Sequence, residues 1–142
     1  MAKNNIVFDE GYKEFNINGD PSRTINFNPA DASIIERLNN VRKEIGQKVA
    51  ELDSMKSEGD ELGDYAKIVE EANKLVKDMI NSIFNADVAD VVFGKQSPLS
   101  NVNGKTLAER FLTAVVPIIQ AEIDEQEKKS RTKVEKYTKK VK

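Results

Sequence analysis

The chain contains no histidine, no cysteine and no tryptophan among its 142 residues. Histidine is the usual general base near neutral pH and the commonest metal ligand, and the cysteine thiolate is a strong nucleophile. Their absence excludes disulfides, zinc–thiolate sites and nucleophilic dyads built on either residue. The residue inventory therefore predicts a protein that is not an enzyme and that holds no metal and no cofactor.

Long apolar runs are missing as well. No segment approaches the roughly 18 consecutive apolar residues of a membrane-spanning helix, and the polar residues 1–5 are not followed by the apolar core of a signal peptide. Charged residues instead make up 32% of the chain, above the roughly 25% of an average domain. This balance favours amphipathic helices in a cytoplasmic protein that makes no contact with membranes.

The N-terminal part shows the alternating pattern of half-buried strands. Residues 12–17 and residues 24–28 each alternate apolar and polar side chains, and the turn-forming sequence Asn-Gly-Asp-Pro at 18–21 lies between them. We therefore predict a β-hairpin, with residues 6–8 (Ile-Val-Phe) as a third strand beside it. A lone hairpin is marginal in water, so it must pack on helices or pair with another chain.

Helical periodicity governs most of the remaining chain. Helices are expected from near 28 to about 55, at 64–84, at 87–93, and from 103–106 to 123. Asn28 and Pro29 suit the N-cap and first turn of the first helix, and Gly94 suits the end of the short one. The predicted fold class is mainly α (α+β), with an N-terminal β-hairpin followed by three main helices and one short helix, in a single domain over residues 1–123.

The last residues differ from the rest in charge. Residues 124–142 contain eight Lys or Arg and four Asp or Glu, a net charge of +4, so residues 1–123 carry −6 of the total of −2. This basic segment either extends the last helix or forms a charged tail. Glu127 and Glu135 interrupt it and only Tyr137 could stack on a base, which favours solvent or an acidic protein surface over nucleic acid.

Two loops contain residue types of known ligand sites without the required spacing. Gly104-Lys105-Thr106 opens a helix as a phosphate-binding loop does, but the motif needs a further glycine where the chain has Leu99. Asp60, Glu61 and Asp64 lack the spacing of an EF-hand. Both are interpreted as ordinary polar loops.

The order of these features resembles a known family. The sequence Ile-Asn-Phe-Asn-Pro-Ala-Asp at 25–31 opens a long charged helix, and Val-Val-Phe-Gly at 91–94 precedes the last one. Over roughly residues 12–123 the chain resembles the tail assembly chaperone-like proteins encoded beside the tape-measure gene in tailed phages of Gram-positive bacteria. The resemblance implies a non-enzymatic protein of the bacterial host cytoplasm that coats the tape-measure protein, a long helical client with exposed apolar stripes, until tail-tube subunits replace it.

A client of this kind would be bound by laying its apolar helical face in a groove. The predicted partner-binding residues lie on one narrow stripe of the first helix, which looks outermost because charges crowd its other faces. They are Ile34, Leu38, Val41 and Ile45.

Two other functions remain open at the level of sequence. The acidic body would suit a phage-encoded inhibitor that occupies the basic channel of a host defence protein. Alternatively, the hairpin could pair edge to edge with neighbouring copies in a minor virion structural subunit. A homo-oligomer is compatible with all three hypotheses.

Overall fold

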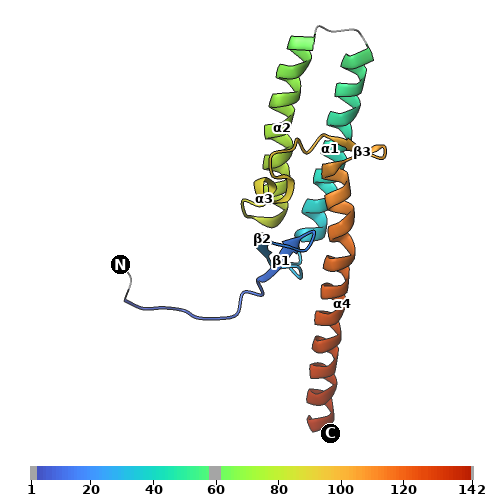
Figure 1. Ribbon diagram of the computed structural model, residues 1–142. Coiled ribbons are helices and arrows are strands. Elements are labelled where there is room, and N and C mark those ends of the chain that lie inside the picture. Colours follow the sequence, from blue (N-terminus) through green and yellow to red (C-terminus); the bar gives the residue numbers. More distant parts are fainter. Residues whose placement is uncertain (1–2, 58–61, 142) are drawn as a thin grey trace.

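The computed structural model describes the backbone of residues 3–57 and 62–141 and the side chains of residues 3–55 and 63–132. In chain order the elements are β1 (Lys13–Ile17), β2 (Asp20–Phe27), α1 (Ile34–Ser57), α2 (Leu62–Phe84), α3 (Ala89–Phe93), β3 (Asn101–Val102), β4 (Lys105–Thr106) and α4 (Leu107–Val141). α1 and α2 form a helical hairpin, and α4 lies beside α1 and continues well past the other elements (Figure 1). The expected mainly α (α+β) class, with a β-hairpin ahead of the helices, is confirmed.

One hydrophobic core lies between the β1–β2 sheet and the helices. It includes, besides residues of α1, the buried side chains of Ile25 and Phe27 from β2, Val76, Ile80, Ile83 and Phe84 from α2, Val92 and Phe93 from α3, and Ala108, Leu112, Val115 and Ile119 from α4. The helical members recur every three or four residues, so each helix turns one apolar stripe inward. Within the described residues, none of the helices combines the length and apolarity needed to cross a membrane.

The predicted β-hairpin is confirmed. β1 and β2 are antiparallel, with Phe15 opposite Ile25. Asn18 and Gly19 both have positive φ, of 52° and 73°, and such left-handed residues give a two-residue turn the twist that joins adjacent strands.

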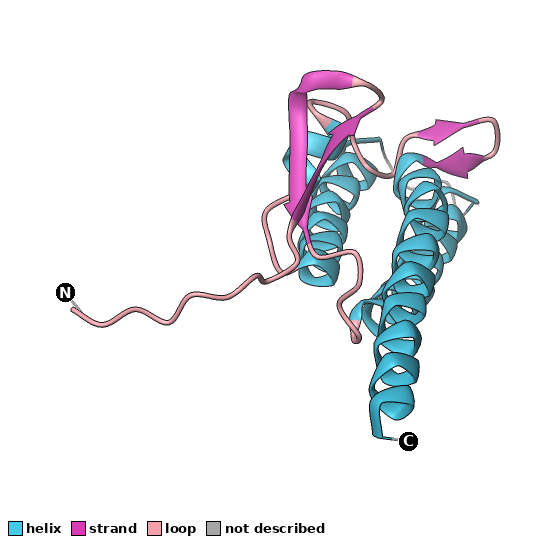
Figure 2. Cartoon of the chain, turned by 90° about the horizontal axis from the view of Figure 1, so that it is seen from below, coloured by secondary structure: helices cyan, strands magenta, loops and turns pink. Residues whose placement is uncertain are grey.

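The predicted third strand at residues 6–8 is wrong. These residues lie in an extended N-terminal arm that pairs with no strand and stretches away from the sheet (Figure 2). The arm is directed by contacts at its base, where Asn28 Nδ2 donates a 3.2 Å hydrogen bond to the carbonyl oxygen of Glu10. The short apolar run of residues 6–8 therefore indicated an extended conformation correctly but not a pairing partner.

The first helix begins at Ile34, later than the predicted start near Asn28 and Pro29. Two short side chains stabilise turns in residues 28–33 instead. Asn28 Oδ1 accepts a 2.9 Å bond from the amide of Ala30, and Asp31 Oδ1 accepts a 3.0 Å bond from the amide of Ser33. Such local bonds compete with helical ones, which explains why the helix starts only after both turns are complete.

The C-terminal half contains one element that periodicity did not indicate. Between α3, which ends at Gly94 as expected, and α4, the short strands β3 and β4 pair as a second hairpin. The buried Thr106 then caps α4, since its Oγ1 accepts a 3.1 Å hydrogen bond from the amide of Glu109. α4 includes Pro117 and runs through Val141, so the basic segment extends the last helix.

Candidate functional site

The four residues predicted to bind a partner lie in the core. Ile34, Leu38, Val41 and Ile45 are each no more than 5% exposed. They belong to the one core cluster, and α1 lies between α2 and α4, so its narrow stripe is covered inside the molecule (Figure 1). The assignment of this stripe as a client-binding surface is therefore corrected: these side chains stabilise the fold and are not accessible to a partner.

A different helix exposes apolar surface. Leu75, in the middle of α2, is 44% exposed, and Ile68 and Met79 on the same helical face are only partly buried. These three positions, i, i+7 and i+11, lie within about 40° of each other around a helix of 3.6 residues per turn. Together they form what we call the α2 ridge, an apolar line beside the core-facing stripe.

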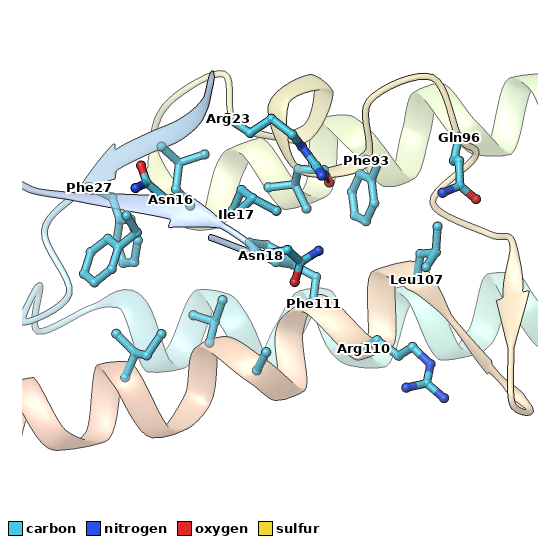
Figure 3. A pocket seen from close by; sticks show the side chains of 16 residues that line it. Asn16, Ile17, Asn18, Arg23, Phe27, Phe93, Gln96, Leu107, Arg110 and Phe111 are labelled. Carbon is cyan, nitrogen blue, oxygen red and sulfur yellow. Dashed lines mark hydrogen bonds between the residues drawn. The ribbon is translucent and has the colours of Figure 1, made fainter. Parts of the chain in front are cut away.

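A second apolar surface is a groove between the sheet and α4. It has a volume of about 510 Å³. We call it the aromatic groove and define it by the side chains that converge on it, which are Phe15 and Ile17 from β1, Phe93 from α3, and Phe111 and Ile118 from α4 (Figure 3). It combines elements that are nearly a hundred residues apart in the sequence.

The phenylalanines that line the groove belong to a connected cluster. The ring centroids of Phe15 and Phe27 are 5.0 Å apart, those of Phe27 and Phe84 4.7 Å, those of Phe84 and Phe111 5.8 Å, and those of Phe93 and Phe111 6.1 Å. Separations of this size are favourable for tilted and edge-to-face aromatic pairs. The cluster thus gives the groove a packed aromatic floor with one open side.

Polar contacts hold α3 and therefore Phe93 in place. Asn81 Oδ1 accepts hydrogen bonds of 2.8 Å from the amides of both Val88 and Ala89, where α3 begins. Arg23 on β2 donates from Nε to the carbonyl oxygen of Val91 at 3.1 Å, and its guanidinium also donates to the carbonyl oxygen of the next residue. These bonds fix α3 against β2 at one wall of the groove.

The two ends of the groove differ in charge. Near the start of β1, Lys13 Nζ lies 2.6 Å from Glu122 Oε1, and this hydrogen bond raises the pKa of Lys13 and lowers the pKa of Glu122. Near the end of β1, Arg110 lines the groove and donates from Nε to the carbonyl oxygen of Val102 at 2.8 Å. The groove therefore has the Lys13–Glu122 ion pair beyond one end and an arginine at the other.

These surfaces suit apolar recognition. Among the residues whose placement is described, no three Asp or Glu side chains gather as a metal site would require. Asp60 and Glu61 of the acidic loop lie outside the described residues. Gly104 and Lys105 form the turn and second strand of the β3–β4 hairpin rather than a phosphate-binding loop.

The architecture defines a small helical protein with a β-hairpin packed across its helices. Residues 22–142 match a family model described as a family of unknown function, DUF6673, and the chain belongs to that family. Neither the curated proteins nor the solved structures gave a match. The family match covers most of β2 and everything after it, and so includes the α2 ridge and two of the three walls of the aromatic groove.

Proposed function

We propose that this chain is a non-enzymatic assembly chaperone that binds an amphipathic helix of a long phage client of the tape-measure kind, in the host cytoplasm. The observation that carries the proposal is the α2 ridge, an apolar line on the surface of a helix whose inward-facing apolar side chains are already buried in the core. Leu75 at its centre is 44% exposed. An apolar face left outside a small domain is a common mark of a partner site.

The spacing of the ridge suits a helical partner. A client helix presents apolar anchors at i, i+3 or i+4 and i+7, and Ile68, Leu75 and Met79 offer a matching line along α2. Packed there, the client would add a further helix to the molecule, alongside α2. The energy would come from burying apolar area on both helices, at about 25 cal/mol per Å².

Acidic side chains border the ridge on its solvent side. Glu71 and Asp78 are exposed and lie three residues after Ile68 and Leu75 respectively, which places them beside the ridge on the helix surface. A client helix with Lys or Arg along one edge of its apolar face would therefore be favoured. The charge would add selectivity and speed of association more than affinity.

The test uses a recombinant helical segment of a phage tape-measure protein as the client, followed by light scattering with and without this chain. Wild-type protein should keep the segment from aggregating. Leu75→Asp should weaken binding by about tenfold or more, as loss of a central apolar anchor does. The matched control is Ile35→Asp, because Ile35 on α1 is 37% exposed but lies off the ridge.

Circular dichroism and urea unfolding of both variants establish that the fold is intact. Wild-type protein that leaves the segment to aggregate would contradict the proposal. So would equal activity of Leu75→Asp and wild type.

A further inference from the structure

The N-terminal arm carries the most exposed apolar side chains in the described part of the chain. Ile6 is 91% exposed, Val7 89% and Phe8 70%. Three consecutive large apolar residues left in water cost free energy that a partner surface would recover. Binding of the arm to an apolar surface would therefore be favourable.

The aromatic groove offers a site of the right chemistry. The chain has six phenylalanines, and five of them, Phe15, Phe27, Phe84, Phe93 and Phe111, form the connected aromatic cluster. The sixth is Phe8 on the arm. A ring entering the open side of the groove would contact Phe15, Phe93 or Phe111 and extend the cluster.

The sheet beside the groove also has a free edge. β1 pairs with β2 and with no other strand among the described residues. The far side of β2 is covered, since Arg23 bonds to the backbone of α3. The outer edge of β1, next to α4, keeps backbone groups that an added strand could pair with.

The length and charges of the arm match the groove in one direction. Lys3 and Asp9 are six residues apart, which spans about 20 Å when extended, and Glu122 and Arg110 are twelve helical residues apart, about 18 Å. An arm running parallel to β1 places Asp9 near Arg110 and Lys3 near the Lys13–Glu122 ion pair. The opposite direction would bring Lys3 close to Arg110, which has the same charge.

The arm of the same chain cannot adopt the parallel direction. It joins β1 through a short connection and could only fold back antiparallel to that strand. Its base is also fixed away from the groove: Gly11 donates a 2.8 Å hydrogen bond to Asp9 Oδ1, and Asn28 holds the carbonyl oxygen of Glu10. Gly11 has a φ of +78°, and a Cβ there would come within 3.0 Å of the Asn28 side chain, so this exit is closely packed.

We infer that the aromatic groove binds the N-terminal arm of a second copy of this chain, which lies parallel to the free edge of β1 and inserts Ile6 and Phe8. Alternate residues of an extended strand point to opposite sides, so Val7 faces away from the groove. The inference concerns contacts between copies and does not depend on the client of the α2 ridge.

Cysteine cross-linking tests the contact directly, because the chain has no cysteine of its own. Ile6→Cys protein is mixed with affinity-tagged Ile118→Cys protein under mild oxidation. The expected product is a disulfide-linked heterodimer, formed in clear excess over a control mixture of Ile6→Cys with Ile35→Cys. Equal yields in the two mixtures would overturn the inference. So would a double variant, Ile6→Cys with Ile118→Cys, that forms only an internal disulfide, detected by mass in the monomer.

The oligomeric state gives a second test. Sedimentation velocity of wild-type protein over about a hundredfold range of concentration should show reversible self-association, as mass action requires. Phe8→Asp should shift the protein to monomer, whereas Val7→Asp, with the same charge one residue away, should weaken association much less. Both substitutions lie in an arm outside the core, so the helical circular dichroism spectrum should be unchanged. A wild type that is monomeric throughout, or equal effects of the two variants, would contradict the inference.

Discussion

Arg37 on α1 donates a hydrogen bond of 2.9 Å from its Nε to the carbonyl oxygen of Ile83 in the last turn of α2. The last four carbonyl oxygens of a helix have no partner within the helix, so this bond satisfies one of them. The same guanidinium donates from Nη2 to Asp31 Oδ2 at 2.7 Å, in the turn before α1. One side chain thus ties the start of α1 to the end of α2.

Replacing Arg37 should lower the stability of the fold. Arg37→Ala leaves the Ile83 carbonyl oxygen without this donor and removes the partner of Asp31, a loss of about 1–3 kcal/mol for a bond to a charged group. Urea unfolding followed by circular dichroism measures the change. Arg42→Ala is the matched control, because Arg42 is an exposed arginine on the same helix. Equal unfolding midpoints for the two variants would show that the bridge contributes nothing.

The same bridge predicts a dependence of stability on pH. The hydrogen bond from Arg37 is the main cause that lowers the pKa of Asp31 below its ordinary value of 3.8, with the Ser33 amide adding to it. Because the pKa is depressed in the folded state, the stabilisation is present above the ordinary value and is lost as pH falls through the folded-state pKa. Asp31→Asn should therefore be less stable than wild type at neutral pH.

The difference between wild type and Asp31→Asn should shrink as the pH is lowered through and below 3.8. Urea unfolding at a series of pH values measures it. Asparagine keeps an oxygen that can accept from the Ser33 amide but turns its NH2 group toward Arg37, so the substitution removes the charge and the bond to Arg37 together. In the Arg37→Ala background the two proteins should differ little at any pH. A difference in the free energy of unfolding that stays constant down to the lowest pH would refute this account.

The buried stripe of α1 predicts a second effect on stability. Leu38 is 2% exposed and packs in the core, so Leu38→Ala should cost about 2–5 kcal/mol, through lost burial and the cavity it leaves. Ile35→Ala, one turn away on the solvent side, should change stability by about 0.5 kcal/mol or less, as surface substitutions usually do. Thermal and urea unfolding of the two variants give the comparison. Similar small effects would mean that the stripe is not core.

Much of the secondary structure could be predicted because its signals are local. The apolar residues of α2 recur every three or four positions, and residues 24–28 alternate strictly. The pattern within each segment therefore indicates its secondary structure. Gly94, with a φ of 60°, ends the short helix as its position suggested. The β3–β4 hairpin was missed because two strands of two residues each are too short to show a period.

The candidate surfaces could not be predicted, because burial depends on which elements meet. A stripe such as that of α1 has the same pattern whether it faces a core or a partner. It is buried because α2 and α4 both pack on α1. The aromatic groove joins β1, α3 and α4, whose residues share no local motif. Phe8 gave no sequence signal of a role at this groove, because residues 6–8 were predicted to form a third strand of the sheet.

The wall of the aromatic groove depends on Asn81. Its Oδ1 accepts from the amides of Val88 and Ala89, both of which belong to buried residues. Asn81→Ala should destabilise the protein by about 1–3 kcal/mol, because it leaves two buried amides desolvated and without a hydrogen-bond acceptor. Asn81→Asp keeps the acceptor oxygen and should recover most of this loss. Urea unfolding gives the stabilities, and hydrogen exchange at the amide of Ala89 shows whether the start of α3 opens first.

Two glycines that would admit a methyl group without any clash should respond in opposite directions to the same substitution. A Cβ built on Gly46 or on Gly94 meets nothing within 4 Å, so steric overlap does not distinguish them. Gly46 lies inside α1, where alanine is favoured over glycine by about 1 kcal/mol. Gly94 has a φ of 60° and a ψ of −125° at the end of α3, a conformation that alanine adopts only at a cost of about 1–3 kcal/mol. Gly46→Ala should therefore raise the unfolding midpoint and Gly94→Ala should lower it. Two shifts of the same sign would mean that backbone conformation does not control the response at one of these positions.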